Sequence, residues 1–199
     1  MFPFKNILLV GVGGQGILTM SRVLGIAAIS KGIKVLTAET HGMAQRGGSV
    51  NVHLRIGDVE SPLIGFGMAD AIVGLEMIEV LRYFNYTNPK TLLILNNRII
   101  RPPGAEKFLS VGEVISELDR LGLKYVIIDA LKLALKAGSR ISENIVLVGG
   151  LLATNVLSGY IDLNDVENAL KSIFSGSSLE INIKAIKYGY EYVINNFGG

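Results

Sequence analysis

The 199-residue sequence contains no cysteine. Disulfide bonds, cysteine nucleophiles, thiolate zinc sites and iron-sulfur clusters held by the chain itself are therefore excluded. Any redox metal chemistry in which this protein takes part must be carried by another chain.

Net charge and long apolar runs are also scarce. The formal net charge is only +2, and no basic run is interleaved with aromatic residues, so we expect no nucleic-acid partner. The longest apolar run, residues 145–154, is too short to span a bilayer, and residues 1–5 lead directly into the first expected strand. We therefore expect a cytoplasmic protein without a membrane anchor.

Apolar residues make up 49% of the chain, enough to bury one sizeable core. No linker, internal repeat or low-complexity tract divides the sequence. We therefore expect a single domain that covers residues 1–199.

The clearest local signature is a glycine-rich turn between an apolar run, residues 7–10, and a helical pattern over residues 17–31. Gly11, Gly13 and Gly16 have the G-x-G-x-x-G spacing, which allows a tight turn and close approach by a ligand or partner. Backbone N–H groups at the helix start would favour a phosphate or carboxylate. The same spacing is also compatible with a purely structural turn of an α/β fold.

Strands and helices are expected to alternate along the chain. Residues 59–64 are expected to pair with the alternating strand 49–56 as a hairpin, which makes the sheet mixed. The predicted fold is a three-layer α/β/α arrangement with a Rossmann-like, mixed central sheet and a helical C-terminal part. The other expected strands are 34–39, 69–75, 91–95 and 125–128, and the expected helices after residue 75 are 76–86, 110–121, 129–136, 145–160, 162–174 and 182–196.

The two histidines have different surroundings. His53 lies on the polar side of the expected alternating strand, which indicates a surface or sheet-face position. His41 shares a polar, glycine-punctuated loop, residues 40–48, with Gln45 and Arg46. Two histidines without nearby paired carboxylates make a poor metal site.

Two acids one helical turn apart, Glu76 and Glu79, are expected on a solvated helix edge or at an interface. No serine stands in a nucleophile-elbow context. Self-contained catalysis is therefore not visible in the sequence.

Two segments carry a family resemblance. Residues 11–19 read GVGGQGILT and residues 41–50 read HGMAQRGGSV. Together they closely resemble the small (beta) subunit of indolepyruvate ferredoxin oxidoreductase, the gamma module of the 2-oxoacid:ferredoxin oxidoreductases. Matches at residues 79–83, 97–102 and 181–185 extend the resemblance over nearly the whole chain. The GGQG turn is shared by gamma modules generally, whereas the HGMAQR loop is typical of the indolepyruvate branch.

The resemblance implies an oxidative decarboxylation in which an arylpyruvate and coenzyme A give the aryl-acetyl thioester and carbon dioxide, with two electrons passed to ferredoxin. It implies that a large (alpha) subunit holds thiamine diphosphate and the iron-sulfur clusters, and that this chain alone holds no cofactor, metal or catalytic residue. It also implies an interface on the active-site or coenzyme A side, for which the candidate residues are Gly13, Gly14, Gln15, Gly16, His41, Gln45 and Arg46.

Three alternatives remain at this point. The chain could be a gamma subunit that acts on pyruvate or 2-oxoglutarate, or a stand-alone NAD(P)- or flavin-binding enzyme. The latter is favoured by the glycine spacing and by Glu39, which lies where a ribose-binding acid often follows the second strand. A non-catalytic assembly protein of another oxidoreductase complex is the third, and the sequence leaves homodimer formation by the isolated chain open.

Overall fold

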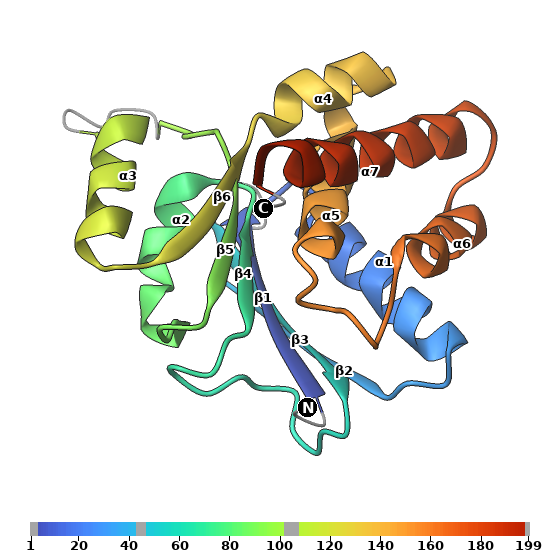
Figure 1. The fold of residues 1–199 in the computed structure, drawn as a ribbon, viewed down its shortest axis with the longest axis horizontal. Coiled ribbons are helices and arrows are strands. Elements are labelled where there is room, and N and C mark those ends of the chain that lie inside the picture. Colours follow the sequence, from blue (N-terminus) through green and yellow to red (C-terminus); the bar gives the residue numbers. More distant parts are fainter. Residues whose placement is uncertain (1–3, 43–46, 102–107, 198–199) are drawn as a thin grey trace.

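The computed structural model describes residues 4–42, 47–101 and 108–197. Within them, one six-stranded sheet is covered by helices on both faces, as Figure 1 shows. Helices α2 and α3 cover one face, and α1, α5, α6 and α7 cover the other. Each face has its own apolar cluster of buried side chains, and the predicted three-layer α/β/α arrangement is confirmed.

The strands lie in the order β2-β3-β1-β4-β5-β6. Parallel pairs join β1 to β4, β4 to β5 and β5 to β6, whereas β3 runs antiparallel to both of its neighbours. The sheet is therefore mixed, as predicted. The strands are β1 (Phe4–Val12), β2 (Val35–His41), β3 (Ser49–Gly57), β4 (Ala71–Gly74), β5 (Leu92–Asn96) and β6 (Lys124–Ile128).

The predicted hairpin partner of β3 is wrong. β3 pairs along its whole length with β1, from Phe4 opposite Gly57 to Val12 opposite Ser49, and its other edge pairs with β2. Because both edges of β3 are occupied, residues 59–64 have no edge to join and form a loop instead. The antiparallel hairpin of this sheet is β2–β3.

The described residues form seven helices and two short 3-10 segments, of which α1, α2, η1 and α3 lie between strands and the others follow β6. The predicted Ser110–Glu113 capping box is present at α3, and Asp162 caps α6 as expected. The last helix begins at Gly176, well before the predicted residue 182. The helices are α1 (Ile17–Ser30), α2 (Met77–Arg82), α3 (Val111–Arg120), α4 (Ala130–Ala137), α5 (Glu143–Ala153), α6 (Leu163–Ile173) and α7 (Gly176–Phe197), with 3-10 segments η1 (Phe84–Tyr86) and η2 (Arg140–Ser142).

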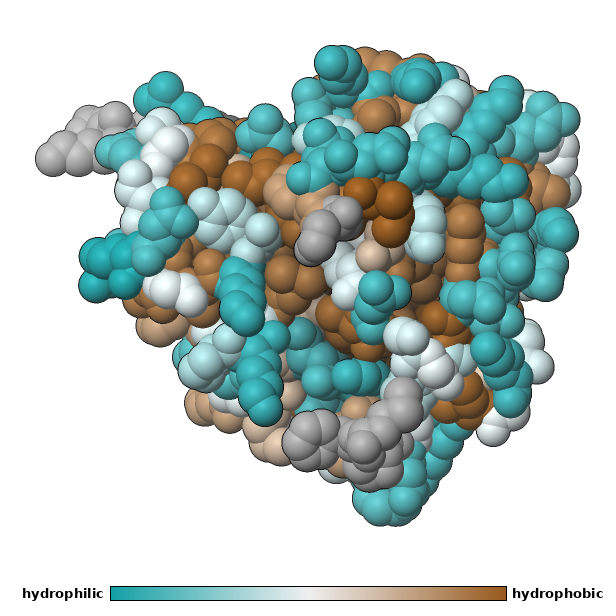
Figure 2. Space-filling view, viewed as in Figure 1, coloured by the Kyte–Doolittle hydropathy of each residue, from teal (hydrophilic) through white to brown (hydrophobic). Residues whose placement is uncertain are grey.

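Helix α5 lies between the sheet and α7, and all of its residues are buried. Gly149 of α5 and Gly189 of α7 let the two helix backbones approach closely, since a Cβ built on either one would collide with a backbone carbonyl of the other helix. Hydrophilic residues cover the outer surfaces of α6 and α7 in Figure 2. The apolar run 145–154 is thus an interior helix, and no described helix is both long and apolar enough to cross a membrane.

Candidate functional site

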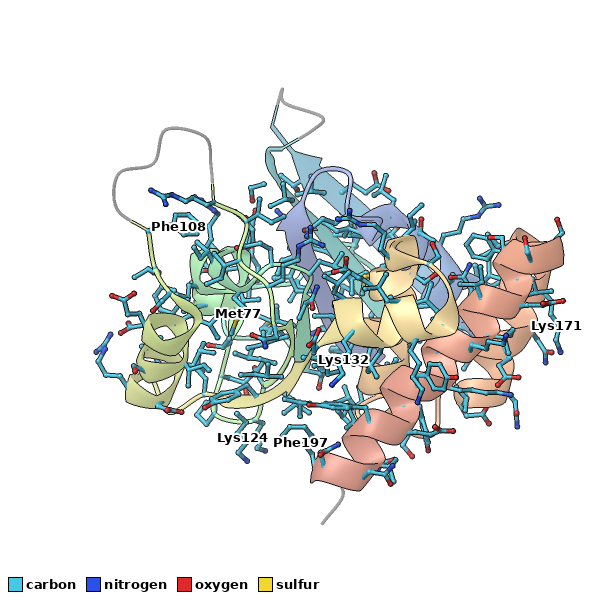
Figure 3. The ribbon with its side chains drawn as sticks, turned by 90° about the horizontal axis from the view of Figure 1, so that it is seen from above. Met77, Phe108, Lys124, Lys132, Lys171 and Phe197 are labelled. Atoms are coloured by element: carbon cyan, nitrogen blue, oxygen red, sulfur yellow. The ribbon has the colours of Figure 1, made fainter. Side chains whose placement is uncertain are left out.

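The glycine turn, residues 13–16, lies where the connections of the sheet change direction. After β1 the chain crosses to the face covered by α1, whereas after β4 it crosses to the opposite face covered by α2. In open α/β sheets, ligands bind in the crevice outside the carboxyl ends of the strands at such a point. Figure 3 looks down on this edge of the sheet, with Met77 in α2 and Lys132 in α4 on opposite sides of the strands.

The turn has a backbone that glycine accommodates best. Gly14 has φ +98° and Gly16, the N-cap of α1, has φ +85°, both in the left-handed region. The amide of Gln15 folds back beneath the turn: its Oε1 accepts from the Val12 N–H at 2.7 Å, and its Nε2 donates to the Leu75 carbonyl at 3.2 Å. Gln15 therefore ties the end of β1 to the residue that follows β4.

Gly11 at the end of β1 makes room for this arrangement. A Cβ built on Gly11 would lie 2.7 Å from the Oε1 atom of Gln15. The first glycine of the sequence signature thus serves packing within the chain, whereas a Cβ on Gly14 would meet no atom of the described chain within 4 Å.

Asn144 of α5 fixes the turn from the other side. Its Nδ2 donates to the Gly16 carbonyl at 3.1 Å, while its Oδ1 accepts from the Ile145 N–H at 2.9 Å. A Cβ on Gly16 would lie 2.5 Å from the same Nδ2 atom. Sequence reasoning missed this residue, and its one local signal is a polar residue directly before the apolar run of α5.

The end of the 40–48 loop is hydrogen-bonded to the turn. The Gly13 N–H donates to the Gly48 carbonyl at 2.8 Å, and the Gly47 N–H donates to the Gly13 carbonyl at 3.3 Å. His41, expected in the loop, is the last residue of β2. The structure thus brings the two signature segments, residues 11–19 and 41–50, into contact at Gly13. The candidate residues Gln45 and Arg46 lie outside the described residues.

Two cavities flank the turn. The first, here called the α5/α7 cavity, has a volume of about 490 Å³ and lies between the turn and the N-terminal ends of α5 and α7. The second has a similar volume and lies on the loop side, lined by residues 16–19, Gly13, Gly14 and Val50. Gly14, Gly16 and Thr19 line both cavities, so an occupant of either one would contact the turn.

A polar network forms one wall of the α5/α7 cavity. Asn96, at the end of β5, donates from Nδ2 to Glu143 at 2.9 Å and to the Leu75 carbonyl at 3.4 Å, and its Oδ1 accepts from the Ala130 N–H at 3.3 Å. Glu143 is the first residue of α5, where the helix dipole favours a negative charge. Arg98 donates to both carboxylate oxygens of Glu143.

Glu76 and Glu79 are buried, so the expectation of a solvated helix edge is wrong. Glu76 is the N-cap of α2: Oε2 accepts from the Glu79 N–H at 2.8 Å, and Oε1 accepts from the Ile100 N–H at 3.0 Å. The carboxylate of Glu79 accepts from the Ser49 hydroxyl and lies 3.3 Å from Nε of Arg82. Burial raises the pKa of Glu76. The N–H groups in the first turn of a helix need hydrogen-bond acceptors, and this explains why an acid, Glu76, occupies the N-cap position of α2.

His53 lies on the sheet face and is buried, with 4% of its surface exposed. Its Nδ1 accepts from the Ile64 N–H at 3.0 Å, and its ring packs edge-on against Tyr86. It lies opposite Leu8 in the middle of β1, away from the glycine turn. Its role is therefore to anchor the loop that follows β3.

The stability of the chain is expected to fall as the pH drops below 6.5, because burial lowers the pKa of His53 from that ordinary value. The unfolded chain then binds a proton that the folded chain does not, so stability present above pH 6.5 is lost as the pH falls toward the folded pKa, by at most about 1.4 kcal/mol per pH unit. Urea unfolding at several pH values measures the slope. His53→Gln should flatten it, and an unchanged slope in that variant would contradict the assignment.

Glu39 does not occupy the position of a ribose-binding acid. It is an exposed residue of β2, and β3 lies between β2 and β1. Two strand spacings, about 9–10 Å, therefore separate β2 from the strand that carries the glycine turn. This arrangement differs from a dinucleotide-binding fold, in which the second strand lies beside the first. Among the described residues, no group of three or more metal-ligating side chains is present either.

Comparisons with known proteins agree with these features. Residues 6–192 match the family described as pyruvate ferredoxin/flavodoxin oxidoreductase. The indolepyruvate oxidoreductase subunit IorB of Archaeoglobus fulgidus is 44% identical over 198 residues, which cover 96% of each chain. The corresponding subunit of Thermococcus kodakarensis is 36% identical over 191 residues, with 92% of this chain and 93% of the relative covered.

A solved structure confirms the fold. The pyruvate oxidoreductase subunit PORC of Thermotoga maritima superposes with a TM-score of 0.74 at 21% identity, over 95% of this chain and 96% of that one. Sequence and fold thus agree over nearly the full length, and the chain belongs to the pyruvate ferredoxin/flavodoxin oxidoreductase family.

Proposed function

We propose that this chain is the small, non-cluster-bearing subunit of a 2-oxoacid:ferredoxin oxidoreductase that acts on indolepyruvate and related arylpyruvates. The observation that carries the proposal is the 44% identity, end to end, with an indolepyruvate oxidoreductase subunit. The reaction joins the aryl-acetyl group to coenzyme A, releases carbon dioxide and passes two electrons to ferredoxin.

The proposal assigns the redox cofactors to the large subunit. Thiamine diphosphate supplies the decarboxylation chemistry there, and iron-sulfur clusters carry the electrons. The cysteine-free sequence of this chain offers no thiolate ligand for a cluster. We therefore assign three roles to its own residues: they bind the large subunit, they form part of the wall of the active site, and they contact coenzyme A, the co-substrate.

We assign this contact to the glycine turn and the 40–48 loop, including His41, Gln45 and Arg46. Gly14 is exposed, and the space above it is open toward both cavities. The N–H groups in the first turn of α1 begin here, and they favour an anionic group. Leu18 and Ile141, which are 50% and 81% exposed, flank the turn with apolar surface suited to a protein partner.

The alternative of a stand-alone nicotinamide or flavin enzyme is disfavoured by the strand order. β3 separates the second strand from the first, so Glu39 is displaced from the glycine turn. The hydrogen bonds of Gln15 and Asn144 also commit much of the turn to contacts within the chain.

Reconstitution tests the proposed function. Mixed with its large subunit under anaerobic conditions, the chain should restore coenzyme A-dependent oxidation of indolepyruvate, with a higher kcat/KM than for pyruvate or 2-oxoglutarate. The chain alone should contain no iron and should not reduce a viologen dye with indolepyruvate. A preference of the complex for pyruvate would contradict the branch assignment, and dye reduction by the purified chain would contradict the division between the subunits.

A further inference from the structure

Glu79, in the first turn of α2, is a buried acid to which the proposed function gives no role. The residue is 7% exposed, and its backbone N–H is held by the carboxylate of the N-cap residue, Glu76. Nε of Arg82, three residues further along the helix, lies 3.3 Å from Oε2 of Glu79. Glu79 is thus a carboxylate in a fixed position, and a carboxylate can only accept hydrogen bonds.

A chain of hydrogen bonds with a single direction ends at this carboxylate. The Ser49 hydroxyl donates to Oε2 of Glu79, and Oγ of Ser49 lies 3.0 Å from the Tyr83 hydroxyl. Because the one hydrogen of the Ser49 hydroxyl is already used, the Tyr83 hydroxyl is the donor between these two groups. The Tyr83 oxygen in turn accepts from Nδ2 of Asn51 at 2.9 Å. The charge of Glu79 therefore sets the donor direction of every member of the chain.

The far end of the chain shows which member orients the others. Asn51 is 4% exposed, and its Oδ1 has no hydrogen-bond partner in the part of the chain that the structure describes. An unpaired buried acceptor is unfavourable, by about 1–3 kcal/mol. The amide of Asn51 thus follows the direction set at Glu79, although this orientation leaves its own oxygen unpaired.

The chain lies on the face of the sheet that α2 covers, at the start of β3 (Figure 1). Val50 and Val52 belong to the apolar cluster on the opposite face, which α1 covers. Since side chains alternate along a strand, Ser49 and Asn51 point toward α2. Ser49 is paired with Val12, the last residue of β1 before the glycine turn.

Ser49 also follows two glycines that contact the glycine turn. The Gly47 N–H and the Gly48 carbonyl both form hydrogen bonds with Gly13, and Gly47 has φ +78°. Glycine loses more conformational freedom on folding than any other residue, and neither glycine has a side chain to hold this segment. On its C-terminal side, the first side chain available for that purpose is Ser49, and Glu79 binds it.

We propose that Glu79 is a positioning residue for the glycine turn: through Ser49 and Tyr83 it holds residues 47–48 against Gly13. Asn144 holds Gly16 from the opposite side, so the turn is fixed from both faces of the sheet. A turn that is ordered in advance costs less to bind, because a ligand or partner does not have to order it. The inference rests on the proposed function, which assigns the turn to coenzyme A and the large subunit.

Amide hydrogen exchange of the full chain alone tests the positioning. Glu79→Gln keeps the shape of the side chain and removes its charge, and it should accelerate exchange of the Gly13 and Gly47 amides about tenfold, since a hydrogen bond to a charged group is weakened. Tyr83→Phe removes one hydroxyl of the chain and should have a smaller effect, and it serves if Glu79→Gln does not fold. Arg82→Gln is the matched control, because Arg82 contacts the same carboxylate, is 58% exposed and lies outside the chain to Ser49.

Kinetics of the complex with the large subunit test the consequence for the reaction. Glu79→Gln and Ser49→Ala should each raise the KM for coenzyme A about tenfold and leave kcat within about twofold of the wild type, the pattern of a binding contact that is lost without a loss of catalysis. A lower stability of the chain would not produce this split. Ser49→Thr keeps the hydroxyl and should restore the wild-type KM.

The two levels of the argument can fail separately. Wild-type exchange at both amides in Glu79→Gln and Tyr83→Phe would overturn the inference, and so would an Arg82→Gln variant that matches Glu79→Gln. Faster exchange in Glu79→Gln, with an unchanged KM for coenzyme A and an unchanged large-subunit affinity, would support the positioning role and contradict the proposed assignment of the turn.

Discussion

Gly189→Ala is expected to lower the free energy of unfolding by about 3 kcal/mol or more. A Cβ at this position in α7 would collide with the carbonyl oxygen of Val146 in α5, a backbone atom that no rotamer change can move away. Insertion of a methyl group into a packed interior typically costs about 1–3 kcal/mol, and contact with a backbone atom places this site at or above that limit. Urea denaturation measures the loss.

Gly112→Ala provides the matched control. Gly112 lies in α3, and its built Cβ would meet only the Ser110 hydroxyl oxygen, at 4.0 Å. In a helix, alanine is favoured over glycine by about 1 kcal/mol, so this variant should be neutral or stabilised. Equal stabilities of the two variants would show that the α5–α7 contact is looser than the structure indicates.

Arg46→Ala is expected to cost about 2–5 kcal/mol in large-subunit affinity or in thioester formation, the range typical of a charged partner lost from a desolvated interface. The next residue, Gly47, is hydrogen-bonded to Gly13 of the glycine turn. In the sequence, Arg46 thus directly precedes a residue of the surface that we assign to the partner and to coenzyme A. Its guanidinium would meet a carboxylate of the large subunit or a phosphate of coenzyme A.

Two measurements decide this prediction: the affinity of the variant for the large subunit and the coenzyme A dependence of turnover. The variant must retain the melting temperature of the wild type. Arg22→Ala, on the exposed side of α1, is the control and should change either quantity by no more than about 1 kcal/mol. If Arg46→Ala matches this control in both, the 40–48 loop is only a surface connection.

Local patterns in the sequence predict most of the elements. The apolar run of β1, the alternation of β3 and the Ser110–Glu113 capping box each depend on neighbouring residues, and the structure contains all three. The partner of a strand is a different matter. The alternation of apolar and polar residues in β3 predicts a strand. That this strand pairs with β1 and β2 rather than with residues 59–64 depends on which strand edges the rest of the sheet leaves free.

The sequence likewise predicts only part of the candidate site. The glycine turn has a spacing signature, whereas Asn144 and Arg98 come near it only through tertiary packing, because α5 packs against α1 and β5, and β5 pairs with β4. Glu76 did carry a usable signal, since an acid between a buried strand and a helix is well placed to cap that helix.

The central position of β1 has a consequence for how the chain acquires its structure. β1 is the first strand to be synthesised, but its neighbours on either side are β3 and β4, which come much later in the chain. Non-local pairings of this kind form slowly and leave apolar strand edges open in the meantime. Because the hydrogen bonds between Gly13 and residues 47–48 close the β1–β3 pair, we expect the glycine turn to become ordered together with that pair.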